Sequence, residues 1–175
     1  MMDAFDVLQV PARFSLDVAD LEARYRELQR ALHPDRFVHA QASERRESLS
    51  RAMAVNEAYR VMTDDLRRAE LLLTRAGRRA STTDPVEPEL LMEIMELREE
   101  LAEARAARNM GAARRLSADV AERERKLHSV LVAAFDGSAA VDPALLEQAQ
   151  RALGRMRYYR RFQDEVATLE DEVSE

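Results

Sequence analysis

The sequence predicts an all-α protein in two parts: an N-terminal helical hairpin with short flanking helices, and a C-terminal three-helix bundle. Of its 175 residues, 46% are hydrophobic and only 4 are glycine and 5 proline, a composition typical of a compact helical protein. Apolar residues recur at intervals of three and four along most of the chain, and no strand-like alternation stands out. Proline and glycine separate the periodic segments, which indicates where the helices begin and end.

The first long helix is predicted to begin after Asp17 and to stop before Pro34. Aspartate caps helices well, and Leu16 and Leu21 have the spacing of a hydrophobic staple around this cap. Proline has no N–H and disfavours the helical region for His33, the residue before it, so the helix must end there. The expected core stripe of this helix is Leu21, Tyr25, Leu28 and Leu32.

The second long helix is predicted to open at Ser43 and to run to about Met62. Its expected inward stripe has spacings of three and four and comprises Leu49, Ala52, Val55, Tyr59 and Met62. Two helices joined by a tight loop pack antiparallel. The hairpin should therefore present the tripeptide 33–35 at one tip.

A row of arginines accompanies the first helix. At about 100° per residue, Arg26 and Arg30 fall nearly opposite the apolar stripe, and Arg24 lies on its flank. We expect these arginines to be free to meet an acidic partner.

The rest of the chain is divided by helix breakers. A helix over about 64–76 should end at Gly77, and a polar connector follows it. Pro88 at a first helical position opens a helix to about Arg108, residues 109–111 form a turn, and a helix over about 112–134 follows. Asp142 and Pro143 open the final helix. The predicted boundaries are 1–76 for the first domain, 77–87 for the connector and 88–175 for the bundle.

The three predicted helices of the bundle each carry apolar residues at helical spacing. The residues expected to face the bundle core are Leu90, Ile94, Leu97, Leu101, Leu116, Val120, Leu127, Leu131, Ala134, Met156, Tyr159, Val166 and Leu169.

The helix that opens at Pro88 carries a second row on the side opposite its core stripe. This row consists of Met92, Met95, Glu96, Glu99 and Glu103, with Leu91 at its margin. Methionine is common at adaptable binding surfaces, and acidic neighbours would add electrostatic selection. The alternative is that the methionines pack beneath the last helix or the hairpin, as methionines at helical spacing often do.

Several stretches resemble a known family in both sequence and order. The hairpin with His33-Pro34-Asp35 resembles a J domain, the activator module of the heat-shock-seventy class of chaperone ATPases. A lone tripeptide is a weak motif, but the whole chain resembles the HscB family of J-domain co-chaperones of bacterial iron–sulfur cluster assembly. The matching stretches are 11–14, 28–30, 33–37, 68–70 with 72–73, 91–93 and 97–101.

This resemblance implies two partners and a role for each domain. The J domain would stimulate an HscA-like chaperone of the heat-shock-seventy class through His33, Pro34 and Asp35, with Arg24, Arg26, Arg30 and Arg36 steering and holding the contact. In the HscB family the α-helical bundle binds the scaffold protein on which iron–sulfur clusters are built, here an IscU-like protein. The implied scaffold-binding residues are Leu91, Met92, Met95, Glu96, Glu99, Glu103 and Tyr158.

Other functions are less favoured by the sequence. An enzyme would use His33 and Asp35 as a base and its orienter, but we expect the intervening proline to splay them, and no nucleophile or phosphate loop accompanies them. The chain has no cysteine, so we expect no metal and no cluster held by thiolates. A net charge of −6 argues against nucleic acid as the main partner.

The sequence lacks several segments that would indicate another location or another class of J protein. No signal-like start or membrane-length apolar run is present, so we expect a cytoplasmic protein that needs no cofactor and binds no membrane. A J protein for general clients would be expected to bring a cysteine-rich or Gly/Phe-rich segment, and none is present. A helical adaptor with an accidental tripeptide remains a further alternative.

Overall fold

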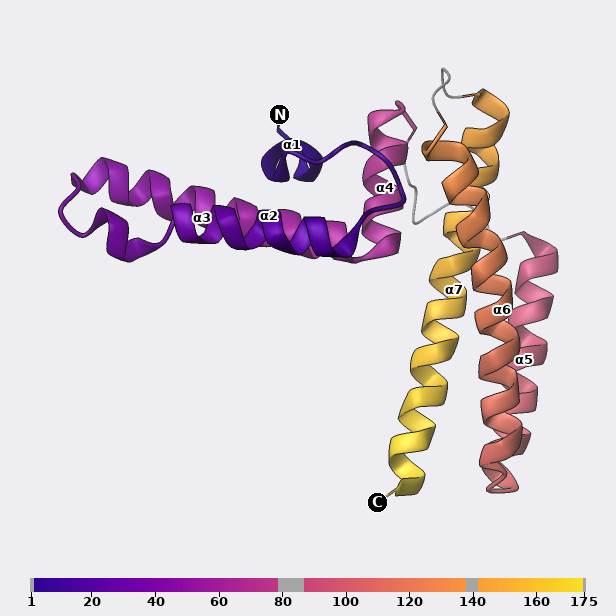
Figure 1. Cartoon of the computed structure of the whole chain (residues 1–175). Coiled ribbons are helices and arrows are strands. Elements are labelled where there is room, and N and C mark those ends of the chain that lie inside the picture. The colour runs from indigo at the N-terminus through magenta and orange to yellow at the C-terminus, as the bar shows by residue number, and fades with distance from the viewer. Residues whose placement is uncertain (1, 79–86, 138–141, 175) are drawn as a thin grey trace. The chain divides into compact units, whose positions relative to one another are not determined.

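A computed structural model describes residues 2–78, 87–137 and 142–174 (Figure 1). Over these residues the chain contains helices and no strand, which confirms the predicted all-α class. It forms two compact units, Met1–Leu72 and Leu73–Glu175. The elements are α1 (Ala4–Leu8), α2 (Val18–Ala31), the 3-10 helix η1 (Pro34–Phe37), α3 (Ala42–Thr63), α4 (Asp65–Arg75), α5 (Pro88–Ala106), α6 (Met110–Phe135) and α7 (Pro143–Ser174).

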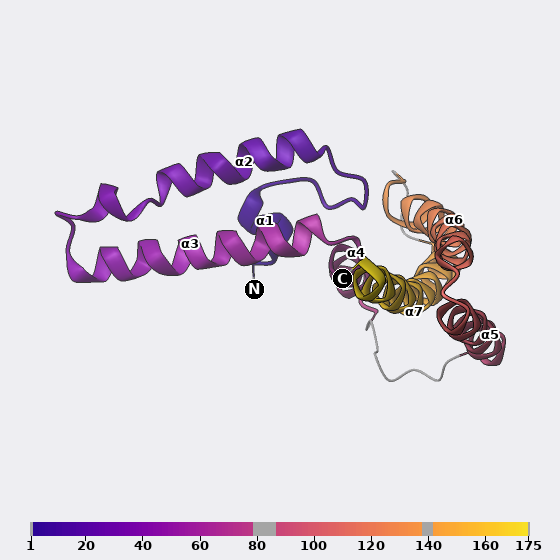
Figure 2. The same ribbon diagram turned by 90° about the horizontal axis from the view of Figure 1, so that it is seen from below.

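Helices α2 and α3 form the predicted hairpin, with α1 packed against them (Figure 2). The predicted cap is confirmed, because the Asp17 carboxylate accepts hydrogen bonds from the N–H groups of Ala19 and Asp20 at 2.9 and 3.1 Å. At the other end α2 stops at Ala31, and Pro34 begins the short helix η1. Helix α3 begins at Ala42, slightly before the predicted Ser43, and Glu44 accepts a hydrogen bond from the Gln41 N–H at 3.2 Å.

The prediction that Leu49 faces inward is wrong. Leu49 is 59% exposed, whereas Ser48 is buried and takes the inward position on α3. Ser48, Val55 and Met62 follow one another at intervals of seven, which keeps them on one helix face, whereas Leu49 lies about 100° further round. Val55 and Met62 are buried as predicted, so the stripe differs from the prediction at its start, where Ser48 takes the inward position expected for Leu49.

A buried arginine joins the loop before α2 to the end of α3. Arg68 is 6% exposed. Its side chain donates to the carbonyl oxygen of Phe14 at 2.8 Å and also to the carbonyl of Met62 and the carboxylate of Asp65. Its guanidinium carbon lies 4.9 Å from the centroid of the Phe14 ring. These bonds satisfy the buried charge, which would otherwise destabilise the unit strongly.

The second unit is a three-helix bundle of α5, α6 and α7, as predicted (Figure 1). Among the described residues, ion pairs that join α5 and its N-cap to α7 include Glu87 with Arg155, Arg98 with Glu165 and Arg105 with Glu172. Each pair spans 67 or 68 residues, so α5 and α7 run parallel and α6 returns between them. The predicted inward residues are buried apart from Leu127, which is half-buried against the core.

The helix ends in the bundle differ slightly from the predicted ones. Helix α6 begins at Met110, because the Asn109 side chain accepts from the N–H of Ala112 at 3.0 Å and so caps the helix earlier than expected. Asp142 accepts from the N–H of Ala144 at 2.8 Å at the start of α7. Gly77 follows α4 with φ +75°, a conformation that glycine adopts without strain. Residues 79–86 of the predicted connector lie outside the described residues, and the domain boundaries stay predictions.

Candidate functional site

The first candidate site is the loop between α2 and α3, which we call the loop site and define as His33, Pro34 and Asp35 together with Arg26 and Arg30. Pro34 turns the chain into η1, so the Asp35 N–H comes within 3.3 Å of the His33 Nδ1 and donates to it. The Asp35 carboxylate then lies 3.5 Å from the same nitrogen. The expectation that proline splays the two side chains is therefore wrong.

Both side chains of this pair face solvent. The His33 side chain is 58% exposed and that of Asp35 is 85% exposed. A contact between two solvent-exposed polar side chains contributes little to folding stability. The loop is therefore a surface feature whose side chains are available to a partner.

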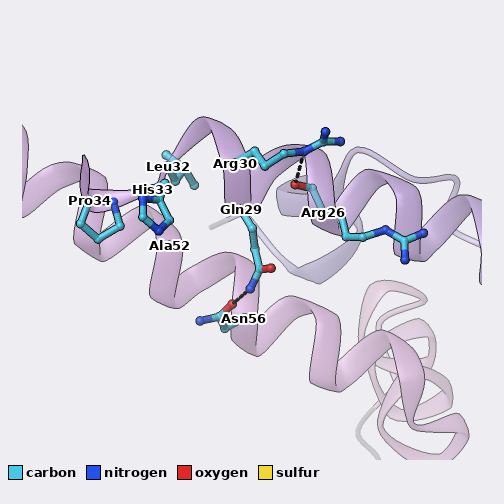
Figure 3. Close-up of a pocket in the computed structure, with 8 residues that line it drawn as sticks. All are labelled: Arg26, Gln29, Arg30, Leu32, His33, Pro34, Ala52 and Asn56. Carbon is cyan, nitrogen blue, oxygen red and sulfur yellow. Dashed lines mark hydrogen bonds between the residues drawn. The ribbon is translucent and has the colours of Figure 1, made fainter. Parts of the chain in front are cut away.

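A groove between α2 and α3 ends at this loop (Figure 3). Arg26 and Arg30 line it from α2, Ala52 and Asn56 line it from α3, and His33 and Pro34 lie at its end. On its floor the Gln29 side chain donates to Asn56 at 3.3 Å. The sequence did not indicate that α3 contributes residues to this groove. Ala52 was expected on the inward stripe of α3, and it lies on the turn of α3 that faces the groove.

The arginines around the groove differ in their availability. Arg26 makes a single exposed pair with Glu22 at 3.4 Å, and the Nε of Arg30 donates to the carbonyl oxygen of Arg26 at 3.3 Å. Both side chains, like that of Arg36, are exposed. They can therefore present positive charge to a partner.

The expectation that Arg24 is free is wrong. Its Nε donates to the carbonyl oxygen of Leu8 at 3.3 Å, a second nitrogen pairs with Glu27 at 2.7 Å, and a third donates to Gln9. Arg24 therefore ties α2 to the end of α1. Sequence periodicity could not show this, because α1 packs against the flank of α2 only in the folded unit.

The second candidate site lies on α5. We call it the α5 face and define it as Leu91, Met92, Met95, Glu96, Glu99 and Glu103. Leu91 is 50% exposed and Met92 and Met95 are each 63% exposed. The predicted exposure of these side chains is confirmed, and the alternative that the methionines pack beneath another helix is wrong. All three carboxylates of the face are exposed, and no ion pair of the described chain involves them.

Tyr158 of α7 is the residue predicted to join this face from another helix. The pairs Arg98–Glu165 and Glu87–Arg155 join residues 67 and 68 apart. Tyr158 lies at the same separation from Leu91, so the two are level on parallel helices. Tyr158 is half-buried against the bundle core, and the Arg161 guanidinium lies 5.6 Å from its ring centroid. The register therefore sets Tyr158 level with Leu91, and its part in this site stays a prediction.

A polar network on the inner side of α5 holds this helix in place. Glu93 accepts from the Tyr159 hydroxyl at 2.6 Å and pairs with Arg123, and Arg155 approaches the same carboxylate at 3.7 Å. Burial, together with the Glu93 carboxylate, raises the pKa of Tyr159 to about 12. The hydroxyl thus stays a donor at neutral pH, and α5 is joined to both neighbours.

Two further properties concern metals and membranes. Within residues 2–78, 87–137 and 142–174, no three His, Cys, Asp or Glu side chains come together in a way that could hold a metal ion. No described helix is long and apolar enough to cross a membrane.

Comparison with solved structures places both units in one known architecture. The chain matches a chaperone HscB from Vibrio cholerae with a TM-score of 0.83 and 29% sequence identity, covering 98% of this chain and 99% of that one. It also matches the human co-chaperone protein HscB with a TM-score of 0.82 and 27% identity, covering 96% of this chain and 82% of that one.

Sequence comparison gives the same result. Residues 3–71 match the DnaJ domain family, and residues 86–167 match the family described as HSCB C-terminal oligomerisation domain. A co-chaperone protein HscB homolog of Azoarcus sp. is 37% identical over 171 residues, which cover 97% of this chain and 96% of the relative. One from Burkholderia multivorans is 39% identical over 142 residues, covering 78% and 81%. With its J domain, its C-terminal helical bundle and relatives that match along nearly its whole length, the chain belongs to the HscB family of co-chaperones.

Proposed function

We propose that this protein activates ATP hydrolysis by a specialised, HscA-like chaperone of the heat-shock-seventy class and delivers an IscU-like iron–sulfur cluster scaffold to it. One observation carries this proposal. This member of the family has two separate exposed sites, the loop site and the α5 face, and each lies on its own compact unit. Such a chain can hold two partners at once.

The loop site is suited to an acidic partner surface. Arg26 and Arg30 are exposed on one wall of the groove, and the tripeptide that ends the groove is exposed as well. Exposed charges of one sign accelerate the association of a partner with complementary charge. The loop site is accordingly proposed to bind the nucleotide-binding part of the chaperone and to promote hydrolysis there.

The α5 face is suited to a partner that combines an apolar pocket with basic residues. Leu91, Met92 and Met95 offer apolar anchors, and exposed large side chains of this kind mark interaction sites. The unpaired carboxylates of Glu96, Glu99 and Glu103 follow along the same helix. A scaffold protein with a basic, apolar patch would meet both features.

Tethering the two partners explains how the protein acts without carrying out chemistry itself. When the bundle holds the scaffold and the J domain engages the ATPase, the scaffold reaches the chaperone at an effective concentration set by the chain between the units. The chaperone then hydrolyses ATP where its client is already present.

The proposal is tested by measuring ATP hydrolysis of the chaperone from the same organism. The protein alone should raise the rate, and the protein together with the scaffold should raise it by more than the sum of their separate effects. Equal stimulation with an unfolded polypeptide in place of the scaffold would indicate a J protein for general clients. No stimulation under any of these conditions would contradict the proposal.

Charge reversal at the groove provides a further test. Replacing Arg26 and Arg30 together by Glu should lower the association rate with the chaperone at least ~10-fold at low salt, because steering by these charges is lost. Binding of the parent protein should weaken as salt is added. Surface plasmon resonance at several ionic strengths measures both effects.

A matched control reverses two exposed arginines of the second unit, Arg108 and Arg115. This control changes the net charge equally but leaves the groove intact, so its association rate should stay close to that of the parent. Salt-independent binding by the parent would show that a different surface docks.

A further inference from the structure

Ser48 is a buried hydroxyl on the inner face of α3, in a position where an apolar side chain would ordinarily be expected. It is 5% exposed. A buried hydroxyl destabilises a protein unless it is hydrogen-bonded. Serine inside a helix often bonds a carbonyl of its own preceding turn, but the Ser48 Oγ instead donates across the hairpin to the carbonyl oxygen of Leu32 at 3.2 Å.

The acceptor of this bond belongs to the peptide that leads into the tripeptide. Leu32 caps the end of α2, and its own N–H donates to the carbonyl of Leu28 at 3.0 Å. In a continuing helix the Leu32 carbonyl would accept from the N–H of Arg36. That N–H donates to the carbonyl of His33 instead, at 3.0 Å, so the Ser48 hydroxyl takes the place of the missing helical donor.

The other hydrogen bonds near the loop either lie within the tripeptide or join α2 to α3 further from it. The bond from the Asp35 N–H to His33 is formed within the tripeptide itself. The Tyr25 hydroxyl bonds Asn56 at 3.1 Å and the Tyr25 ring stacks on Tyr59, but Tyr25 lies about two turns before the loop. The Gln29–Asn56 bond joins the helices about one turn before the tripeptide. Among the hydrogen bonds of the described hairpin, the Ser48 bond is therefore the α2–α3 connection nearest to residues 33–35.

We propose that Ser48 is a positioning residue for the loop site. Its hydroxyl fixes the peptide before His33, so that His33 and Asp35 are held in one arrangement before the chaperone arrives. This inference rests on the proposed function of the loop site. A preorganised loop loses less conformational entropy on binding, so Ser48 lowers the concentration needed for activation and leaves the rate at saturation unchanged.

The test compares Ser48→Ala with Ser50→Ala in the chaperone ATPase assay. Alanine removes the hydroxyl, adds no bulk and favours the helix, and Ser50 is an exposed serine on the same helix. Ser48→Ala should raise the half-maximal activating concentration about 5-fold, the factor that corresponds to one hydrogen bond of ~1 kcal/mol. Its maximal rate should equal that of the parent, and Ser50→Ala should match the parent in both quantities.

A second measurement follows the loop in the free protein. In Ser48→Ala, ¹⁵N relaxation should show lower order parameters for the Asp35 and Arg36 amides, with the amides of α5 unchanged. An unchanged loop would overturn the inference, whether or not the activating concentration rises, because any rise would then reflect stability alone. If the parent protein activates no chaperone but the variant still loosens the loop, the proposed function fails while Ser48 keeps its anchoring role.

Discussion

His33→Gln is expected to abolish activation of the chaperone ATPase while leaving the protein folded. The His33 side chain is 58% exposed and its local partner, Asp35, is more exposed still, so the substitution removes no buried contact. Exposed substitutions of this kind usually change the free energy of unfolding by no more than about 0.5 kcal/mol. Steady-state ATP hydrolysis and thermal melting followed by circular dichroism measure the two effects.

His39→Gln provides the matched control for this experiment. His39 is also exposed and lies a few residues beyond the tripeptide, so the same chemical change there should leave activation intact. Asp35→Asn should behave like His33→Gln, because it alters the other side chain of the pair. Activation retained by both tripeptide variants would remove the basis for assigning the loop site to the ATPase.

Replacing Leu91, Met92 and Met95 together by Ala should weaken scaffold binding at least ~10-fold. Exposed anchors that become buried in a complex commonly contribute 1 kcal/mol or more each. The free protein should lose little stability, because these side chains are 50% to 63% exposed and alanine favours a helix. Isothermal titration calorimetry with the scaffold and thermal melting of the free variant measure both quantities.

The matched control for this variant truncates exposed apolar residues elsewhere. Leu49 and Met53 on α3 are 59% and 65% exposed, and replacing both by Ala should leave scaffold affinity unchanged. The triple variant should still activate the chaperone when no scaffold is present, because its changes lie in the other unit. If the triple variant binds scaffold normally, the α5 face is not the docking surface.

Local sequence patterns determined the ends of α2 and the exposed face of α5, on which these experiments depend. Asp17 and Pro34 set the ends of α2 through a cap and a missing N–H, both of which act within a few residues. The spacing of Leu90, Ile94 and Leu97 oriented α5, and this orientation alone places Met92 and Met95 on the outer side. Such features can be predicted from sequence because each depends on neighbours along one helix.

Packing between helices decided the remaining features. Whether Ser48 or Leu49 faces α2 depends on how the two helices meet, because the residues lie only about 100° apart. Arg24 proved to be engaged because α1 brings Leu8 and Gln9 to it, and Tyr158 reached the level of Leu91 through the α5–α7 register. The sequence by itself thus determined the helices and their exposed rows, whereas contacts between residues far apart in the chain decided which side chains remain free for partners.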